Sequence, residues 1–174
     1  MKKPFHVLGI VILAAILGGC QNTAERSSSA TANDGRVQVS FENPEQFTDV
    51  SSSYKGRVDQ GYLAALRSFI DREARRYLAP DQTLALTFRD IDLAGDFEPW
   101  RGPNATDVRM VRSIYPPRLK FDYTVTNANG EIVRQGHESL TDLTFDWRLH
   151  LPDRSDPVYY EKALLRDWMA RALR

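Results

Sequence analysis

The stretch LKFDYTVTNANGEIVRQGHESL, residues 119–140, decides the fold class of this chain. Over residues 119–126 apolar side chains alternate with polar ones, which is the period of a half-buried β-strand. The following Asn127-Ala128-Asn129-Gly130 contains residue types that tolerate the positive φ values of tight turns. A second strand over residues 131–140 then completes a predicted antiparallel hairpin.

The strand that begins at Thr83 contains an irregularity. Leu84, Leu86 and Phe88 share one phase, but Ile91 and Leu93 are out of step with them by one residue. A β-bulge near Arg89 and Asp90 would re-aim the side chains, and bulges are over-represented beside functional sites.

One more strand and two helices complete the expected elements. Val37, Val39 and Phe41 alternate with polar residues over residues 36–42, which predicts an N-terminal strand. Helical spacing predicts an amphipathic helix from near Asp59 until Pro80 stops it. Its apolar positions are Tyr62, Leu66, Phe69, Ile70, Tyr77 and Leu78.

A second helix is expected near the C-terminus. Asp156 is the predicted N-cap and Pro157 the first helical residue, a position where proline is favoured. The expected apolar stripe is Tyr160, Leu164, Leu165, Trp168 and Ala172.

These elements follow one another in the order β-α-β-β-β-α. They predict an α+β fold in which a mainly antiparallel sheet of about four strands carries two helices on one face. The chain has 174 residues, of which 42% are hydrophobic, so residues 36–174 have the size and composition of a single globular domain.

The N-terminal residues have the pattern of a secretory signal, assigned to residues 1–19. Lys2 and Lys3 precede an apolar run from Val7 to Leu17, which is shorter than the ~20 residues that span a bilayer. The ending Leu17-Gly18-Gly19-Cys20 resembles the bacterial lipobox, whose cysteine is acylated. Cys20 is the only cysteine in the chain, which favours lipidation over an incidental thiol in a plain secretory signal.

Residues 20–35 are therefore expected to form a lipidated cysteine and a disordered tether. Residues 21–35 are small and polar without apolar periodicity, and a flexible segment of that length reaches roughly 20 Å. Gln21 stands where many inner-membrane lipoproteins carry aspartate. The expected location is the inner leaflet of the outer membrane, facing the periplasm.

The charge balance of the chain argues against nucleic acid as a partner. Lys plus Arg and Asp plus Glu both total 23, whereas phosphate-backbone binding needs a basic surface. Arg67, Arg72, Arg75 and Arg76 form the one arginine-rich segment. Because Asp71 and Glu73 are interleaved with them, a solvated helix face is the preferred interpretation over an anionic partner.

Most catalytic motifs are absent from the sequence. His137 and His150 are too far apart for the paired spacing of a zinc site. The chain has no G-x-S-x-G elbow, no P-loop and no G-x-G-x-x-G turn. We therefore expect no cofactor, and the hypothesis of an enzymatic activity is not the preferred one.

One dense polar segment remains, the sequence DIDLAGDFEPWR at residues 90–101. Asp90, Asp92, Asp96 and Glu98 could serve as an acid-base pair or, chiefly through the three aspartates, hold Ca²⁺ or Mg²⁺. The preferred alternative is an ion-pair network, because arginines lie close in sequence. These arginines are Arg101, Arg109 and Arg112.

Aromatic residues form a second candidate set, because aromatic and arginine side chains often anchor interfaces. The set comprises Trp100, Trp147, Trp168, Tyr159 and Tyr160. Trp168 falls within the predicted helix stripe and is assigned to the core.

Several motifs in the same order resemble a family of proteobacterial lipoproteins or exported proteins known as domain of unknown function 3016. They are FENPE and FTD at residues 41–49, DIDLAG and EPW at 90–100, DVR at 107–109, PRL at 117–119, YEK at 160–162 and DW at 167–168. The resemblance covers nearly all of residues 36–172. It implies an exported or lipid-anchored envelope domain and assigns no reaction and no catalytic residues.

Two functions remain open. The preferred one is a non-enzymatic binding module, tethered to the membrane through Cys20, that contacts an envelope protein, glycan or lipid. The alternative is an envelope enzyme or metal-binding domain that uses Asp90, Asp92, Asp96 and Glu98. The enzyme requires these carboxylates to line a pocket unpaired.

Overall fold

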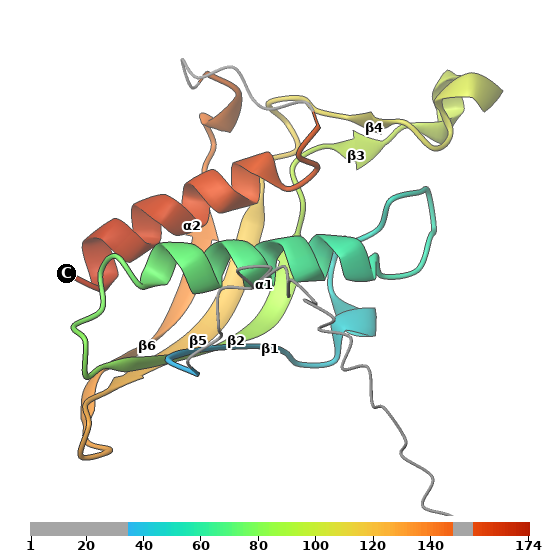
Figure 1. Ribbon diagram of the computed structural model, residues 1–174. Helices are drawn as coiled ribbons and strands as arrows, with labels where there is room; N and C mark the ends of the chain where they lie inside the picture. The colour runs from blue at the N-terminus through green and yellow to red at the C-terminus, as the bar shows by residue number, and fades with distance from the viewer. Residues whose placement is uncertain (1–34, 148–154) are drawn as a thin grey trace, which may run out of the picture. The chain divides into compact units, whose positions relative to one another are not determined.

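The computed structural model describes residues 35–147 and 155–174 (Figure 1). Its main sheet has four strands in the spatial order β1-β2-β5-β6. Their bounds are Val37–Phe41 for β1, Thr83–Asp92 for β2, Arg118–Thr126 for β5 and Ile132–Thr141 for β6. The predicted α+β class is confirmed.

The pairing of the strands follows from their connections. β5 and β6 are antiparallel and joined by the predicted turn, in which the Asn127 carboxamide oxygen accepts hydrogen bonds from the backbone N–H groups of Asn129 and Glu131. β2 and β5 are also antiparallel. β1 is parallel to β2, because the helix between them crosses the sheet and returns the chain in the same direction.

The predicted bulge is present in β2. The β2–β5 register shifts between Phe88 and Asp90, so Arg89 is the extra residue. As a result Leu84, Leu86, Phe88 and Ile91 are all buried, although their spacing changes from two to three residues. The bulge also leaves Asp90 and Asp92 on the opposite, partly exposed side of the strand.

Helices α1 (Gln60–Ala74) and α2 (Tyr159–Ala172) cover one face of this sheet (Figure 1). The Asp59 carboxylate caps α1 by accepting hydrogen bonds from the N–H groups of Gly61 and Tyr62, at 2.8 and 3.3 Å. α1 ends before the predicted stop. Tyr77 and Leu78 lie in the turn that follows it, where their N–H groups bond to the Ala74 carbonyl.

The predicted start of α2 is wrong by two residues. Val158 occupies the N-cap position without a side-chain cap, and Pro157 precedes the helix. Asp156 instead accepts a hydrogen bond from the Val158 N–H and pairs with the Lys162 ammonium. The carboxylate predicted to cap the helix therefore forms an ion pair with Lys162 as well as a backbone hydrogen bond before the helix begins.

The segment after β2 contains structure that periodicity did not predict. Two-residue strands β3 (Asp96–Phe97) and β4 (Arg109–Met110) form a second, antiparallel sheet, with short 3-10 helices η2 (Pro99–Arg101) and η3 (Pro103–Ala105) between them. We call residues 96–114 the arm. Figure 1 shows its β3–β4 part projecting beyond the main sheet and the helices. Strands of two residues are too short to show an alternation.

Across residues 35–147 and 155–174, no helix combines the length and apolar character needed to cross a membrane.

Candidate functional site

Asp90 has nearby partners that hold it in a fixed position. Its carboxylate accepts hydrogen bonds from the Thr48 N–H at 2.8 Å and hydroxyl at 3.1 Å, and from Lys120 at 3.3 Å. Burial acts to raise the pKa of Asp90, but these hydrogen bonds outweigh it and lower the pKa below its ordinary value. Asp90 therefore joins the segment before α1 to β2 and β5.

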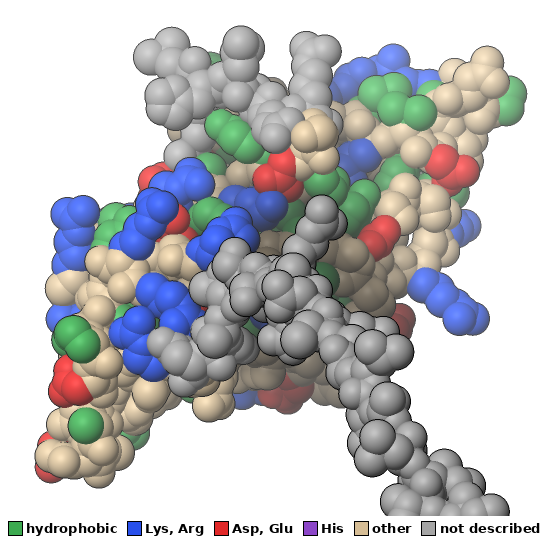
Figure 2. All heavy atoms as spheres, in the orientation of Figure 1, with side chains coloured by type: hydrophobic (Ala, Val, Ile, Leu, Met, Phe, Trp, Pro, Cys, Tyr) green, Lys and Arg blue, Asp and Glu red, His purple; other side chains and the backbone are tan. Residues whose placement is uncertain are grey.

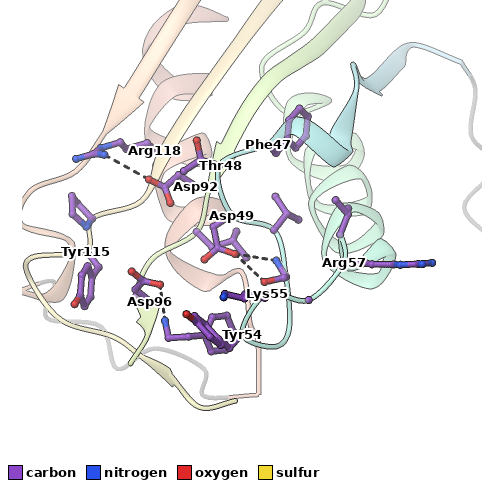
Figure 3. Close-up of a pocket in the computed structure, with 18 of the residues that line it drawn as sticks. Phe47, Thr48, Asp49, Tyr54, Lys55, Arg57, Asp92, Asp96, Tyr115 and Arg118 are labelled. Carbon is purple, nitrogen blue, oxygen red and sulfur yellow. Dashed lines mark hydrogen bonds and ion pairs between the residues drawn. The ribbon is translucent and has the colours of Figure 1, made fainter. Parts of the chain in front are cut away.

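A cleft of about 600 Å³ lies beside the end of β2. Its walls come from residues 45–58, the β2–β3 junction and residues 114–118. Figure 3 shows Asp49, Asp92 and Asp96 entering this cleft from different segments, with Tyr54 and Tyr115 on its border. Asp92 and Asp96 belong to the predicted set of carboxylates, whereas Asp49 does not, because it is distant along the chain.

Among the candidate carboxylates, Asp92 has the pKa that departs most from its ordinary value. Burial raises the pKa of Asp92 to about 6, against the positive charge of Arg118, whose guanidinium is 3.7 Å away (Figure 3). The carboxylates of Asp49, Asp90 and Asp96 act in the same direction as burial. Asp92 thus combines a raised pKa with a cleft position.

Glu98 is neutralised within the arm. Its buried carboxylate pairs with the Nε of Arg101, lies 3.4 Å from Arg112 and accepts a hydrogen bond from the Tyr115 hydroxyl at 3.3 Å. Burial acts to raise the pKa of Glu98, but Arg101 and then Arg112 outweigh it and lower the pKa. The network predicted with Arg101 and Arg112 exists at this carboxylate.

Arg109 does not pair with any of the four predicted carboxylates. Its guanidinium binds Asp49 at 2.7 Å and the carbonyl oxygens of Gly95 and Ser51 at 2.9 and 2.8 Å. It also lies over the Phe97 ring, 4.5 Å from its centroid. Arg109 therefore fastens the base of the arm to the loop before α1.

The four predicted carboxylates do not form one site. Asp90 and Glu98 are paired, and exposed Asp96 accepts a hydrogen bond from the neighbouring Phe97 N–H. Among the residues that the structure describes, no group of three or more His, Cys, Asp or Glu side chains could hold a metal ion. The enzyme hypothesis required unpaired carboxylates in a pocket; Asp92 combines a cleft position with a raised pKa, but it is paired with Arg118.

The arm exposes apolar side chains. Trp100 is 71% exposed and Ile114 is 68% exposed, and Val108 and Val111 are exposed as well. Trp100 lies on η2 between Pro99 and Arg101, so the pairing of Arg101 with buried Glu98 fixes the backbone that presents the indole. The arm thus offers a preorganised apolar surface.

The other aromatic candidates divide between core and surface. Trp168 is buried, and its ring packs edge-on against Phe121 and Tyr123, as predicted for the core. Tyr159 and Tyr160 are half-buried and pack edge to face on each other. Trp147 is exposed on the short 3-10 helix η4 (Phe145–Trp147).

His137 lies on the exposed side of β6 and hydrogen-bonds to Asp122 at 2.7 Å. That bond, followed by the bond from Arg89, lowers the pKa of Asp122. His137 is thus a surface residue of the hairpin. Cys20 and His150 lie outside the described residues.

Glu161, which was not among the predicted site residues, is the most deeply buried ionisable group in this region. Its side chain is 1% exposed, Oε1 accepts a hydrogen bond from the Ala94 N–H at 2.7 Å, and Oε2 has no partner in the described structure. Burial raises the pKa of Glu161 to about 7. Its position three and four residues before Leu164 and Leu165, on the apolar stripe, was the available signal.

The fold and the site define a small α+β domain whose mainly antiparallel sheet and two helices support a projecting arm. A family model described as "Protein of unknown function (DUF3016)" matches residues 35–171. The chain belongs to this family. Comparison with curated proteins and with solved structures found no match.

Proposed function

We propose that this protein is a lipid-anchored cell-envelope binding module whose arm contacts an envelope protein. In this proposal residues 1–19 are removed and Cys20 carries the lipid. Residues 21–35 link it to the domain, at the inner leaflet of the outer membrane facing the periplasm. The lipobox-like ending at Cys20, the sole cysteine, supports the anchor.

The exposed apolar surface of the arm carries the proposal of a binding function. Large apolar side chains that gather on a fixed surface mark interaction sites, and tryptophan and arginine are enriched among interface anchors. Trp100 and Ile114 are exposed while the nearby Glu98 and Arg109 hold the arm in place. A rigid arm loses little conformational freedom on binding, which favours affinity.

A protein fits this surface better than a glycan or a lipid. Exposed apolar residues lie there among exposed polar ones, and such a mixture around an aromatic anchor is typical of protein interfaces, whereas a glycan needs many hydrogen-bonding groups around the aromatic ring. The exposed apolar residues are Trp100, Pro103, Val108, Val111 and Ile114. The arm is also fastened to the domain through Asp49 and Ser51, as a rigid contact surface requires.

Site-specific photocrosslinking tests the proposal. A photoreactive phenylalanine analogue replaces Trp100 or, separately, Ile114 in the full chain expressed in a host that processes lipoproteins. We expect a discrete protein adduct from both positions. Ile132, which is 57% exposed at the far end of the β5–β6 hairpin, is the matched control and should give none.

Equal labelling at all three positions would contradict the arm as the contact site. An adduct that shrinks after muramidase digestion would instead identify a glycan partner.

The lipid anchor is tested separately with Cys20→Ser, which should lose the lipid mass and leave the membrane fraction. A membrane-bound, unmodified variant would contradict lipidation.

A further inference from the structure

A second surface hollow lies between α1 and α2, far from the arm along the chain. This helix groove has a volume of about 370 Å³, and Phe69 and Tyr159 contribute to its wall. Four of the residues that line it carry a positive charge, namely Arg72, Arg76, Lys162 and Arg166. Figure 2 shows Lys and Arg side chains gathered over the two helices.

The acids in the helix groove do not neutralise these cations. Glu73 is 8% exposed and lies between two arginines, 3.2 Å from Arg76 and 3.8 Å from Arg166. Asp156 binds Lys162 with both carboxylate oxygens, at 2.9 and 2.8 Å. Four cations and two acids leave a surplus of two positive charges.

The surplus charge faces solvent. Arg76 and Arg166 are 72% and 51% exposed at the side chain, and Arg72 forms no ion pair with any residue in the described parts of the chain. The Arg166 guanidinium also lies over the Phe69 ring, 5.2 Å from its centroid, which restrains its position.

The structure therefore changes the interpretation of the arginine-rich helix. In the sequence, Asp71 and Glu73 are interleaved with the arginines and favour a solvated face. In the fold, Asp71 binds Arg75 at 2.8 Å and Glu73 is buried beneath the arginines, so the outer surface is basic.

We propose that the helix groove binds the phosphate groups of anionic phospholipids at the membrane surface. Guanidinium groups match phosphate oxygens in geometry and charge, and clustered basic residues attract anionic leaflets. The zero net charge of the whole chain disfavours nucleic acid as the source of phosphate. The inference rests on the proposed anchor, because residues 21–35 would keep the domain within roughly 20 Å of the bilayer.

Arginine modification of the lipidated full chain tests this inference. The protein is reconstituted into vesicles of phosphatidylcholine alone or with about a third phosphatidylglycerol, an anionic content sufficient for basic-patch binding. Phenylglyoxal then modifies exposed arginines, and peptide mass spectrometry reports the rate at each position. We expect Arg72, Arg76 and Arg166 to react about tenfold more slowly on anionic vesicles, with the protection lost at high salt.

Arg118 serves as the internal control, because it is exposed on β5 and should react equally on both vesicles. Arg72→Gln with Arg76→Gln should abolish the protection of Arg166, whereas Arg118→Gln should preserve it. Equal rates on both vesicles would overturn the helix groove as a lipid site. The same protection by inorganic phosphate on phosphatidylcholine vesicles would show a free-phosphate site and overturn the lipid assignment.

Flotation of the same samples separates this inference from the proposed anchor. A protein that floats with both vesicles but shows no selective protection contradicts the helix groove alone. A protein that floats with neither contradicts both the anchor and the groove.

Discussion

At the scale of single residues, the buried carboxyl of Glu161 has the clearest energetic consequence. Its position on the apolar stripe of α2 brings Oε1 within 2.7 Å of the Ala94 N–H, at the end of β2 and the base of the arm. Burial disfavours the charged carboxylate, so the folded protein retains the proton to about pH 7.

Stability should therefore decrease with rising pH through this group. Between the ordinary pKa of a glutamate, about 4.3, and the folded value of about 7, the folded state binds more protons than the unfolded state. The contribution of Glu161 to the free energy of unfolding is fully present below the ordinary pKa of about 4.3, and it is lost as pH rises through the folded pKa of about 7. Glu161→Gln should remove about 2 kcal/mol of this pH dependence, measured by urea unfolding at about pH 5 and about pH 8.

The matched control for that measurement is Glu98→Gln, which removes a carboxylate whose pKa is lowered instead of raised. It should not flatten the decrease in stability toward alkaline pH. An unchanged slope in Glu161→Gln would contradict the assignment.

Gly95 is a second residue whose identity the fold requires. Its φ is +83°, and a Cβ there would lie 2.9 Å from the Met110 carbonyl oxygen. Gly130 has a similar φ of +79° with nothing within 4 Å of such a Cβ. Gly130→Ala should cost about 1 kcal/mol from backbone strain, and Gly95→Ala about 3 kcal/mol because a clash is added.

Thermal unfolding of the two variants compares these costs. Equal losses would mean that the backbone of the arm moves away from residue 95 without cost.

At the scale of elements, Arg109 makes several of the contacts that attach the arm to the rest of the domain. The Arg109 guanidinium contacts Asp49, Ser51 and Gly95 at once, which the single ammonium of lysine cannot reproduce. Arg109→Lys should destabilise the protein by about 2 kcal/mol and accelerate amide hydrogen exchange in the arm more than in β5.

Arg112→Lys is the control for the arm. It alters a partly exposed contact with Glu98 at 3.4 Å and should leave arm exchange close to that of the original chain. Uniformly faster exchange in Arg109→Lys would indicate global destabilisation without a specific effect on the arm.

At the scale of the whole molecule, one core joins the sheet to both helices. It includes Leu66 on α1, Leu84 and Phe121 on the sheet, and Trp168 on α2. Because these elements share the same buried contacts, unfolding one of them exposes the others.

Leu66→Ala should therefore lower the free energy of unfolding by about 3 kcal/mol, the cost of a cavity at a fully buried position. Leu143→Ala makes the same chemical change at a 70% exposed position and should alter stability by at most about 0.5 kcal/mol. Denaturant unfolding followed by far-UV and near-UV circular dichroism measures both values. Comparable losses in the two variants would contradict the described core.

Several elements of the fold could be predicted from local signals in the sequence alone. Alternation specified the strands of the main sheet, Asn127 to Gly130 specified the hairpin turn, and the phase slip near Arg89 located the bulge. The start of α1 near Asp59 was also predicted, because the signals that begin a helix involve only neighbouring residues. These features recur at short, fixed spacings along the chain.

Which charged groups pair with one another could not be predicted in this way, because the pairs form between distant parts of the folded chain. Asp49 and Arg109 are sixty residues apart, and Glu161 reaches Ala94 across sixty-seven. Asp156 was predicted as the N-cap of α2 but forms an ion pair with Lys162. Glu73 is buried beneath Arg76 and Arg166. Ion pairing and burial depend on distance in space, so the same sequence of charges gave a network at Glu98, a cleft at Asp92 and a basic groove between the helices.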